Sequence, residues 1–254
     1  LTLTTADPTS PDKPVIDGNN ATNPIKIAAS NVTVEGLEVI RGSGDLVYCS
    51  SAYSNLTVRH CVLHDGGDEG VQIKSSTNVL IENCLAYDID GDGFNLDGVT
   101  NGTIRNCEVT DCRSVNGCIY ITYCNTSTVE DCWIHDIYDS QTGIYFKDNK
   151  GGTHTIRNNV ITENWFDGDA SWHLTAGSAI YLRKPIMNGY AATINVEHNT
   201  LCDNYGTNAA GVSGHGIGWD WNGTATLVVN LKNNVASGNS GKALAVEKDS
   251  VYYG

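Results

Sequence analysis

The chain has 254 residues, 40% of them hydrophobic, and its 29 acidic and 15 basic residues give a formal net charge of −14. This composition supports a buried core and excludes a disordered chain. No apolar run of about 18 residues occurs, so we expect no membrane insertion. The acidic balance argues against nucleic acid as a partner of the surface as a whole.

A four-residue motif recurs along the chain, from residues 34–37 (Val-Glu-Gly-Leu) to residues 231–234 (Leu-Lys-Asn-Asn). Its third positions are Gly36, His60, Asn83, Asn106, Asp131, Asn158, His198 and Asn233. They are separated by 24, 23, 23, 25, 27, 40 and 35 residues. Eight matches at such a period indicate a stack of structural repeats.

Each repeat has the pattern of three short strands. One repeat holds strands at Gly93–Asp97, 103–104 and Cys107–Asp111, with Phe94 and Leu96 pointing inward. Alternation with period two and turn residues every few positions favour strands over helices. The sequence therefore predicts an all-β fold, a right-handed parallel β-helix of about nine coils of three short strands. Equivalent positions would stack about 4.8 Å apart.

Stacking predicts columns of like residues. An inward ladder would contain Cys61, Cys84, Cys107 and Cys132, continued by Asn159, Asn199 and Asn234. A column of carboxylates at the end of the third strand is expected to cap turns; it contains Asp65, Asp88, Asp111, Asp136, Glu163 and Asp203. Whether Cys112, Cys118 and Cys124 pair is left open by the sequence.

The repeats resemble those of the pectate-lyase-like superfamily of parallel β-helix proteins over residues 24–247. Residues 12–18 (Asp-Lys-Pro-Val-Ile-Asp-Gly) and 30–39 are similar to methanogen and bacterial surface proteins of this architecture, among them the disaggregatases, which loosen a chondroitin-like matrix. The resemblance implies a secreted or cell-surface protein that acts on polysaccharide. We expect residues 1–254 to form one domain of a longer protein with both end caps missing and with other domains as partners.

In such proteins the outward face of the first strand forms the sugar groove. One outward row is predicted to hold Gln72, Asn95, Tyr120, Tyr145, Tyr181 and Gly218, and the next row Lys74, Asp97, Thr122, Lys147, Arg183 and Asp220. Insertions at 164–177 and 204–214 enlarge two coils, and long loops in solenoids are often functional. Since aromatic faces bury the apolar side of sugars, the predicted substrate-binding residues are Tyr120, Lys74, Lys184, Trp165, Trp172, His173, His215, Trp219 and Asp220.

Resemblance to polysaccharide lyases implies a uronate-containing substrate. Lys147 or Arg183 would take the proton beside the carboxylate, and Tyr145 or Tyr181 would protonate the leaving oxygen. The alternative is hydrolysis by the carboxylates of Asp92 and Asp97.

Residues 90–96 resemble the first acidic motif of polygalacturonases, and residues 214–216 resemble their Gly-His-Gly motif. The paired aspartates expected one coil after the acidic motif are absent. That departure weakens an assignment to the polygalacturonases.

The alternating carboxylates of Asp88, Asp90 and Asp92 have the pattern of a calcium loop, although the same residues also suit a plain turn. A calcium ion at this loop and a plain turn without a metal are thus both left open, and no other cofactor is expected. The leading prediction is an enzyme that cleaves an acidic glycan, a lyase before a hydrolase. The alternative is a non-catalytic glycan-binding or structural surface β-helix, whose coils would be uniform in length.

Overall fold

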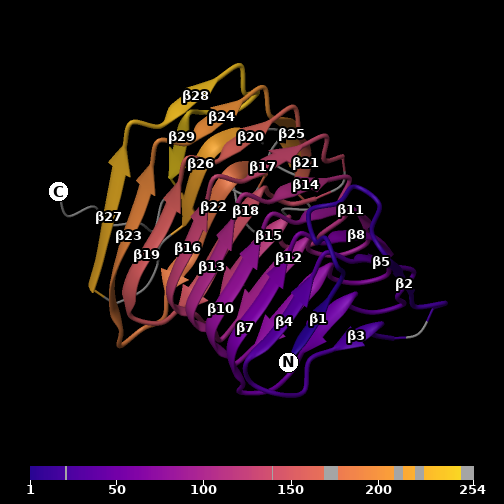
Figure 1. The fold of residues 1–254 in the computed structure, drawn as a ribbon. Coiled ribbons are helices and arrows are strands. Elements are labelled where there is room, and N and C mark those ends of the chain that lie inside the picture. The colour runs from indigo at the N-terminus through magenta and orange to yellow at the C-terminus, as the bar shows by residue number, and fades with distance from the viewer. Residues whose placement is uncertain (21, 139, 169–176, 209–213, 221–225, 247–254) are drawn as a thin grey trace.

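The computed structural model describes residues 1–254 except 21, 139, 169–176, 209–213, 221–225 and 247–254. Within these bounds every regular element is a β-strand, and three parallel sheets of nine strands each wind along one axis (Figure 1). No helix of the described residues has the length and apolar character to cross a bilayer. The predicted parallel β-helix of about nine coils is confirmed.

Strands of successive coils pair side by side in all three sheets. Sheet A contains β1 (Thr2–Thr4), β4 (Val32–Glu35), β7 (Ser54–Arg59), β10 (Thr77–Glu82), β13 (Thr100–Arg105), β16 (Asn125–Glu130), β19 (Gly152–Arg157), β23 (Ala191–Glu197) and β27 (Thr226–Lys232). Sheet B contains β2 (Val15–Asp17), β5 (Glu38–Ile40), β8 (Val62–Gly66), β11 (Leu85–Ile89), β14 (Glu108–Thr110), β17 (Trp133–His135), β20 (Val160–Thr162), β24 (Thr200–Cys202) and β28 (Val235–Ser237). Sheet C contains β3 (Ile25–Lys26), β6 (Val47–Cys49), β9 (Val71–Lys74), β12 (Phe94–Asp97), β15 (Ile119–Thr122), β18 (Ile144–Asn149), β22 (Ser178–Ile186), β26 (His215–Asp220) and β29 (Leu244–Val246).

The repeated motif marks the bend from sheet A to sheet B. Its third residue has a left-handed backbone in every coil, with φ between 50° at Asn106 and 69° at Gly36. Glycine, asparagine and aspartate tolerate this conformation best, which explains their recurrence at this position. The carboxylate column beginning at Asp65 also has positive φ throughout, from 45° to 59°. The structure therefore gives that column a conformational role, and the capping of turn N–H groups stays a prediction.

The predicted inward ladder is present. Its four cysteines are at most 2% exposed. Beyond them, Asn159 Nδ2 donates to Asn199 Oδ1 (2.9 Å), and Asn199 Nδ2 donates to Asn234 Oδ1 (2.9 Å). The amides also bond backbone groups, so the ladder satisfies the polar groups of its bends. All nine cysteines are unpaired thiols, and eight of them are buried.

Sheet A carries a row of alternating charge. The strand register places Glu35, Arg59, Glu82, Arg105, Glu130, Arg157, Glu197 and Lys232 side by side in that order. Arg59 Nε lies 2.7 Å from Glu35 Oε1, and Arg105 Nη2 lies 2.7 Å from Glu82 Oε2. Each of these two carboxylates is about nine-tenths buried beneath its arginine.

Candidate functional site on sheet C

The two predicted rows on sheet C are confirmed by the strand register. Tyr145 pairs with Tyr120 and Tyr181, and Lys147 pairs with Thr122 and Arg183. The three tyrosines form a cluster separate from the core, with ring centroids 5.0 and 5.3 Å apart. They thus point away from the core, as the alternation predicts.

This tyrosine row is not an open face. Tyr120, Tyr145 and Tyr181 are 9, 2 and 2% exposed, and the rings stack on one another. A sugar ring therefore cannot stack on them in this conformation. The second row is more open, since the side chain of Lys147 is 28% exposed and Arg183 is half-buried.

The groups around Lys147 combine a lysine, an arginine and a tyrosine. Arg183 Nη1 donates to the Tyr145 hydroxyl at 3.1 Å. Burial is the main cause of the lowered pKa of Lys147, and the positive charge of Arg183 is the second. Asp148, whose Oδ2 lies 4.0 Å from the Lys147 Nζ, opposes this lowering. Burial raises the pKa of Tyr145, which stays protonated. The site thus pairs a lysine that deprotonates more readily than usual with a fixed cation.

A β-bulge lies beside this site. Lys147 pairs with Arg183, but Asn149 pairs with Ile186, so β22 has one more residue here than β18. Lys184 takes up the extra length with a φ of 38°. Bulges bend a strand and redirect side chains, and this one places a third cationic residue next to the lysine–arginine pair.

The two carboxylates predicted for hydrolysis lie in different settings. Asp92 is 1% exposed, accepts hydrogen bonds from Ser114 Oγ and from Asn95 Nδ2 (2.8 Å), and has its pKa raised to about 8 by burial. Asp97 is half-buried, and burial raises its pKa against the lowering effect of Lys74. Only Asp97 is therefore accessible to a substrate.

The predicted calcium ligands do not form a common site. Arg113 Nη1 donates to Asp90 Oδ1 (2.9 Å) and Arg113 Nη2 lies 3.5 Å from Asp88 Oδ1, while Asp92 faces Ser114 and Asn95. Among the described residues the carboxylates that converge are Asp45, Asp68 and Glu69. The residues present do not fit a calcium loop at 88–92.

Sequence reasoning missed this second cluster, although a signal for part of it existed. Asp45, Glu69 and Asp92 are separated by 24 and 23 residues, the repeat length, and the register places them in one column. Burial, with Asp45 also contributing, raises the pKa of Glu69 to about 7, and burial raises that of Asp68 to about 6. No periodicity pointed to Asp68.

The other predicted binding residues are dispersed. His215 and Trp219 lie two residues on either side of Ile217 in β26, so their side chains point inward as Ile217 does. His215 is 3% exposed, and Trp219 packs against the core. A sugar-contacting role for these two is therefore wrong, because strand alternation turns them inward. Asp220 is outward but buried, and Lys74 Nζ lies 5.8 Å from the ring centroid of Tyr48.

The predicted insertions are only partly described. Trp165 is 46% exposed in β21 (Trp165–Gly168), which pairs in parallel with β25 (Tyr205–Asn208) as an extra two-stranded sheet. Trp172 and His173 lie outside the described residues. Of the two predicted tryptophans that the structure describes, Trp165 is thus the one placed where a ligand could contact it.

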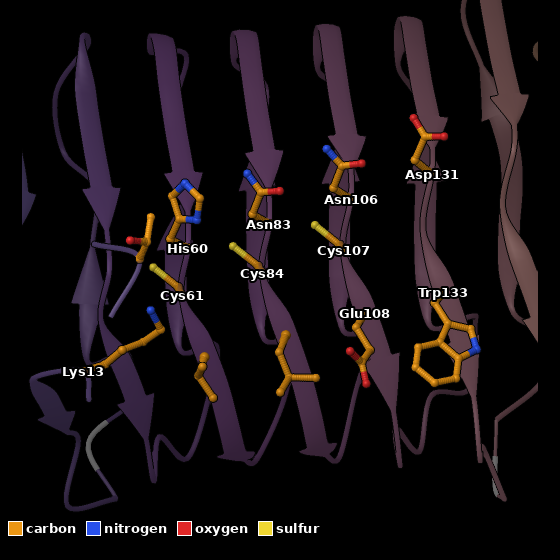
Figure 2. A pocket seen from close by; sticks show the side chains of 13 residues that line it. Lys13, His60, Cys61, Asn83, Cys84, Asn106, Cys107, Glu108, Asp131 and Trp133 are labelled. Atoms are coloured by element: carbon orange, nitrogen blue, oxygen red, sulfur yellow. The ribbon is translucent and has the colours of Figure 1, made fainter. Parts of the chain in front are cut away.

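A groove of about 640 Å³ runs along the bend between sheets A and B, on a different part of the surface (Figure 2). It is lined by Thr9, Lys13, His60, Cys61, Val62, Asn83, Cys84, Leu85, Asn106, Cys107, Glu108, Asp131 and Trp133. Trp133 is 46% exposed and stacks on His135 at 3.7 Å between centroids. The groove contains none of the residues predicted for catalysis.

A family profile described as the right handed beta helix region matches residues 12–139 and 67–184. The chain belongs to the right-handed β-helix family. The profile match agrees with the three stacked parallel sheets and extends over the coils that carry Lys147 and Arg183. No curated protein sequence matches this β-helix.

Solved β-helix structures resemble it at low identity. The A-module of mannuronan C-5 epimerase AlgE6 from Azotobacter vinelandii is 18% identical, with a TM-score of 0.45, 86% of this chain and 61% of that one covered. The endo-xylogalacturonan hydrolase of Aspergillus tubingensis is 14% identical (TM-score 0.42; 96% and 72% covered). The surface protein and adhesin PfbA of Streptococcus pneumoniae is 10% identical (TM-score 0.37; 88% and 91% covered). This β-helix spans about three-fifths of the epimerase modules it matches.

Proposed function

We propose that this β-helix is a secreted or cell-surface enzyme that cleaves a uronate-containing polysaccharide by β-elimination at Lys147. The observation that carries the proposal is a partly exposed lysine whose pKa is lowered by burial and by Arg183, while Arg183 is held by the Tyr145 hydroxyl. Such a lysine is a better general base near neutral pH than an ordinary one. The bulge at Lys184 adds positive charge where an anionic sugar would bind.

In the proposed reaction the neutral Lys147 amine takes the proton from the carbon next to the uronate carboxylate. Arg183 and Lys184 offset the negative charge that builds up on that carboxylate. The bond from the neighbouring carbon to the glycosidic oxygen then breaks, and its loss leaves a carbon–carbon double bond in the sugar ring. The Lys147 ammonium returns the proton to the leaving oxygen, so the protons balance on one residue.

The burial of Tyr145 favours a positioning role over the predicted role as acid. Its ring is 2% exposed, and its hydroxyl accepts the Arg183 hydrogen bond. Tyr181, equally buried, is stacked against it. We therefore expect Tyr145→Phe to weaken substrate binding through Arg183 more than it slows the chemical step.

The test is incubation with a panel of uronate-containing glycans, a chondroitin-type polymer among them. Ultraviolet absorbance of unsaturated uronate and new reducing ends are followed together. A lyase produces both signals, and Lys147→Ala should lower the rate by roughly 10²–10⁴-fold. The matched control is Lys232→Ala, a lysine on the exposed end of sheet A. Reducing ends without absorbance would instead indicate hydrolysis and direct attention to Asp97.

The groove along the bend of sheets A and B favours a second candidate, a non-catalytic glycan-binding β-helix. Its exposed Trp133 offers an aromatic face of the kind that packs against sugar rings. Glycan binding that Trp133→Ala abolishes, with neither product signal, would support this candidate against the enzyme.

A further inference from the structure

Three carboxylates meet in the turns that lead into sheet C. Asp45 precedes β6, and Asp68 and Glu69 precede β9 in the next coil. One oxygen of each lies within 4.8 Å of the other two. Leu46 N donates to Glu69 O at 2.9 Å, so backbone bonding holds the two turns together. This carboxylate cluster therefore joins two successive coils.

Glu69 supplies a separate observation. It is 9% exposed, and its Oε1 accepts hydrogen bonds from Gln72 Nε2 (2.8 Å) and Asn95 Nδ2 (3.2 Å). Its Oε2 is buried and receives no hydrogen bond from an N–H or hydroxyl donor of the described residues, while the carboxyl group interacts with those of Asp45 and Asp68. The Oδ1 of Asn95, a residue 4% exposed, is also buried and receives no hydrogen bond from such a donor. Buried oxygens of this kind cost free energy unless another group binds them.

No basic side chain makes an ion-pair contact with the cluster in the described residues, and Lys74 acts on Asp68 only as a charge at longer range. In the described part of the chain, no lysine, arginine or histidine forms an ion pair with Asp45, Asp68 or Glu69. The amide of Asn23 is 3.5 Å from Asp45 Oδ2 and carries no charge. A bound cation would therefore be the first positive charge in contact with these carboxylates among the described residues, and it would have to displace the protons that their raised pKa values favour.

We propose that Asp45, Asp68 and Glu69 bind a calcium ion that ties the second and third turns into sheet C together. Carboxylate oxygens are hard ligands of the kind that calcium takes. Three oxygens within 4.8 Å of one another can all lie about 2.8 Å or less from one point, close to calcium's ~2.3–2.6 Å. Asp68 is exposed, which leaves room for water ligands on one side.

This site is independent of the proposed cleavage reaction. It uses none of the residues around Lys147, and it differs from the calcium loop that the sequence suggested at Asp88, Asp90 and Asp92. Its expected effect is on stability, because the ion binds the folded arrangement of two coils and not the unfolded chain. It can therefore be tested without any enzymatic assay.

The experiment is calorimetric titration of the chelator-treated protein with Ca²⁺, with thermal unfolding followed at each calcium concentration. We expect saturable binding and an unfolding midpoint that rises with calcium. Asp68→Asn, at an exposed position, should raise the Kd on the order of tenfold or more, since affinity follows the charge of the ligands. Glu69→Gln should do the same.

The matched control is Asp90→Asn, which removes an exposed carboxylate of the sequence-predicted loop. It should bind calcium like the unaltered protein. Absence of saturable binding would overturn the proposal. So would an Asp68→Asn protein that binds normally, or an Asp90→Asn protein that loses binding.

Discussion

The ring of His154, in β19, is buried inside the coil. It is 0% exposed and packs edge-on against Phe146 with centroids 4.9 Å apart. Its Nε2 lies 3.2 Å from the carbonyl oxygen of Lys150, which can only accept, so Nε2 carries the proton. Nδ1 then accepts from Ser127 Oγ at 2.9 Å. Both ring nitrogens are therefore satisfied in the neutral form.

Protonation of His154 should cost stability. Burial lowers its pKa from 6.5 to about 4, and about 1.4 kcal/mol per pH unit makes this shift worth ~3 kcal/mol. Because the pKa of His154 is lower in the folded than in the unfolded protein, the neutral ring makes its full contribution to the free energy of unfolding above pH 6.5. It is lost as the pH falls from 6.5 to about 4, where the unfolded chain binds the proton more tightly.

The matched variant is His154→Gln, whose amide can donate to Lys150 and accept from Ser127 but does not titrate. Urea unfolding of both proteins at pH 7 and pH 4 measures the difference. Unfolding free energy should fall by ~3 kcal/mol more in the histidine protein, all other titrations being shared. Equal losses in the two proteins would refute the reasoning, as would an NMR titration showing the ring charged above pH 6.

Three further outcomes are expected. Asn159→Ala removes an amide that bonds Val129 O and leaves buried groups unpaired, so denaturant titration should show a loss of ~2–3 kcal/mol. A thiol reagent should modify half-buried Cys202 in the native protein and reach the eight buried cysteines only after unfolding, as mass spectrometry would show. Asp148 raises the pKa of Lys147, so Asp148→Asn should shift the rising limb of the pH–rate profile to lower pH; an unchanged limb would argue against Lys147 as the base.

The sequence was sufficient to predict the register of the coils. Tyr145 and Tyr181 were placed in one row although an insertion separates them, because each lies between inward apolar residues of its own strand. The same alternation, applied strictly, would have turned His215 and Trp219 inward. The sugar-binding role predicted for these two residues was wrong because it was inferred from residue type alone. It did not consider which face of the strand each side chain occupies.

Other features of the site depend on more than periodicity. Whether an outward row such as Tyr120 to Tyr181 is open is decided by tertiary packing, which no repeat pattern encodes. The partner of Asp90 is Arg113, which lies one coil away. The approach of Asp68 to Asp45 depends on the path of a turn. Spacing thus predicts which residues are neighbours, and the three-dimensional path decides which of them touch.

The alternating charges of sheet A also constrain the order in which coils can stack. Each coil offers a charge opposite to those of both neighbours, so an assembly that skips one coil would set glutamate against glutamate or arginine against arginine. The row therefore disfavours stacks in which an odd number of coils is skipped, because like charges would then lie side by side on sheet A. The native order of coils places only opposite charges side by side in this row.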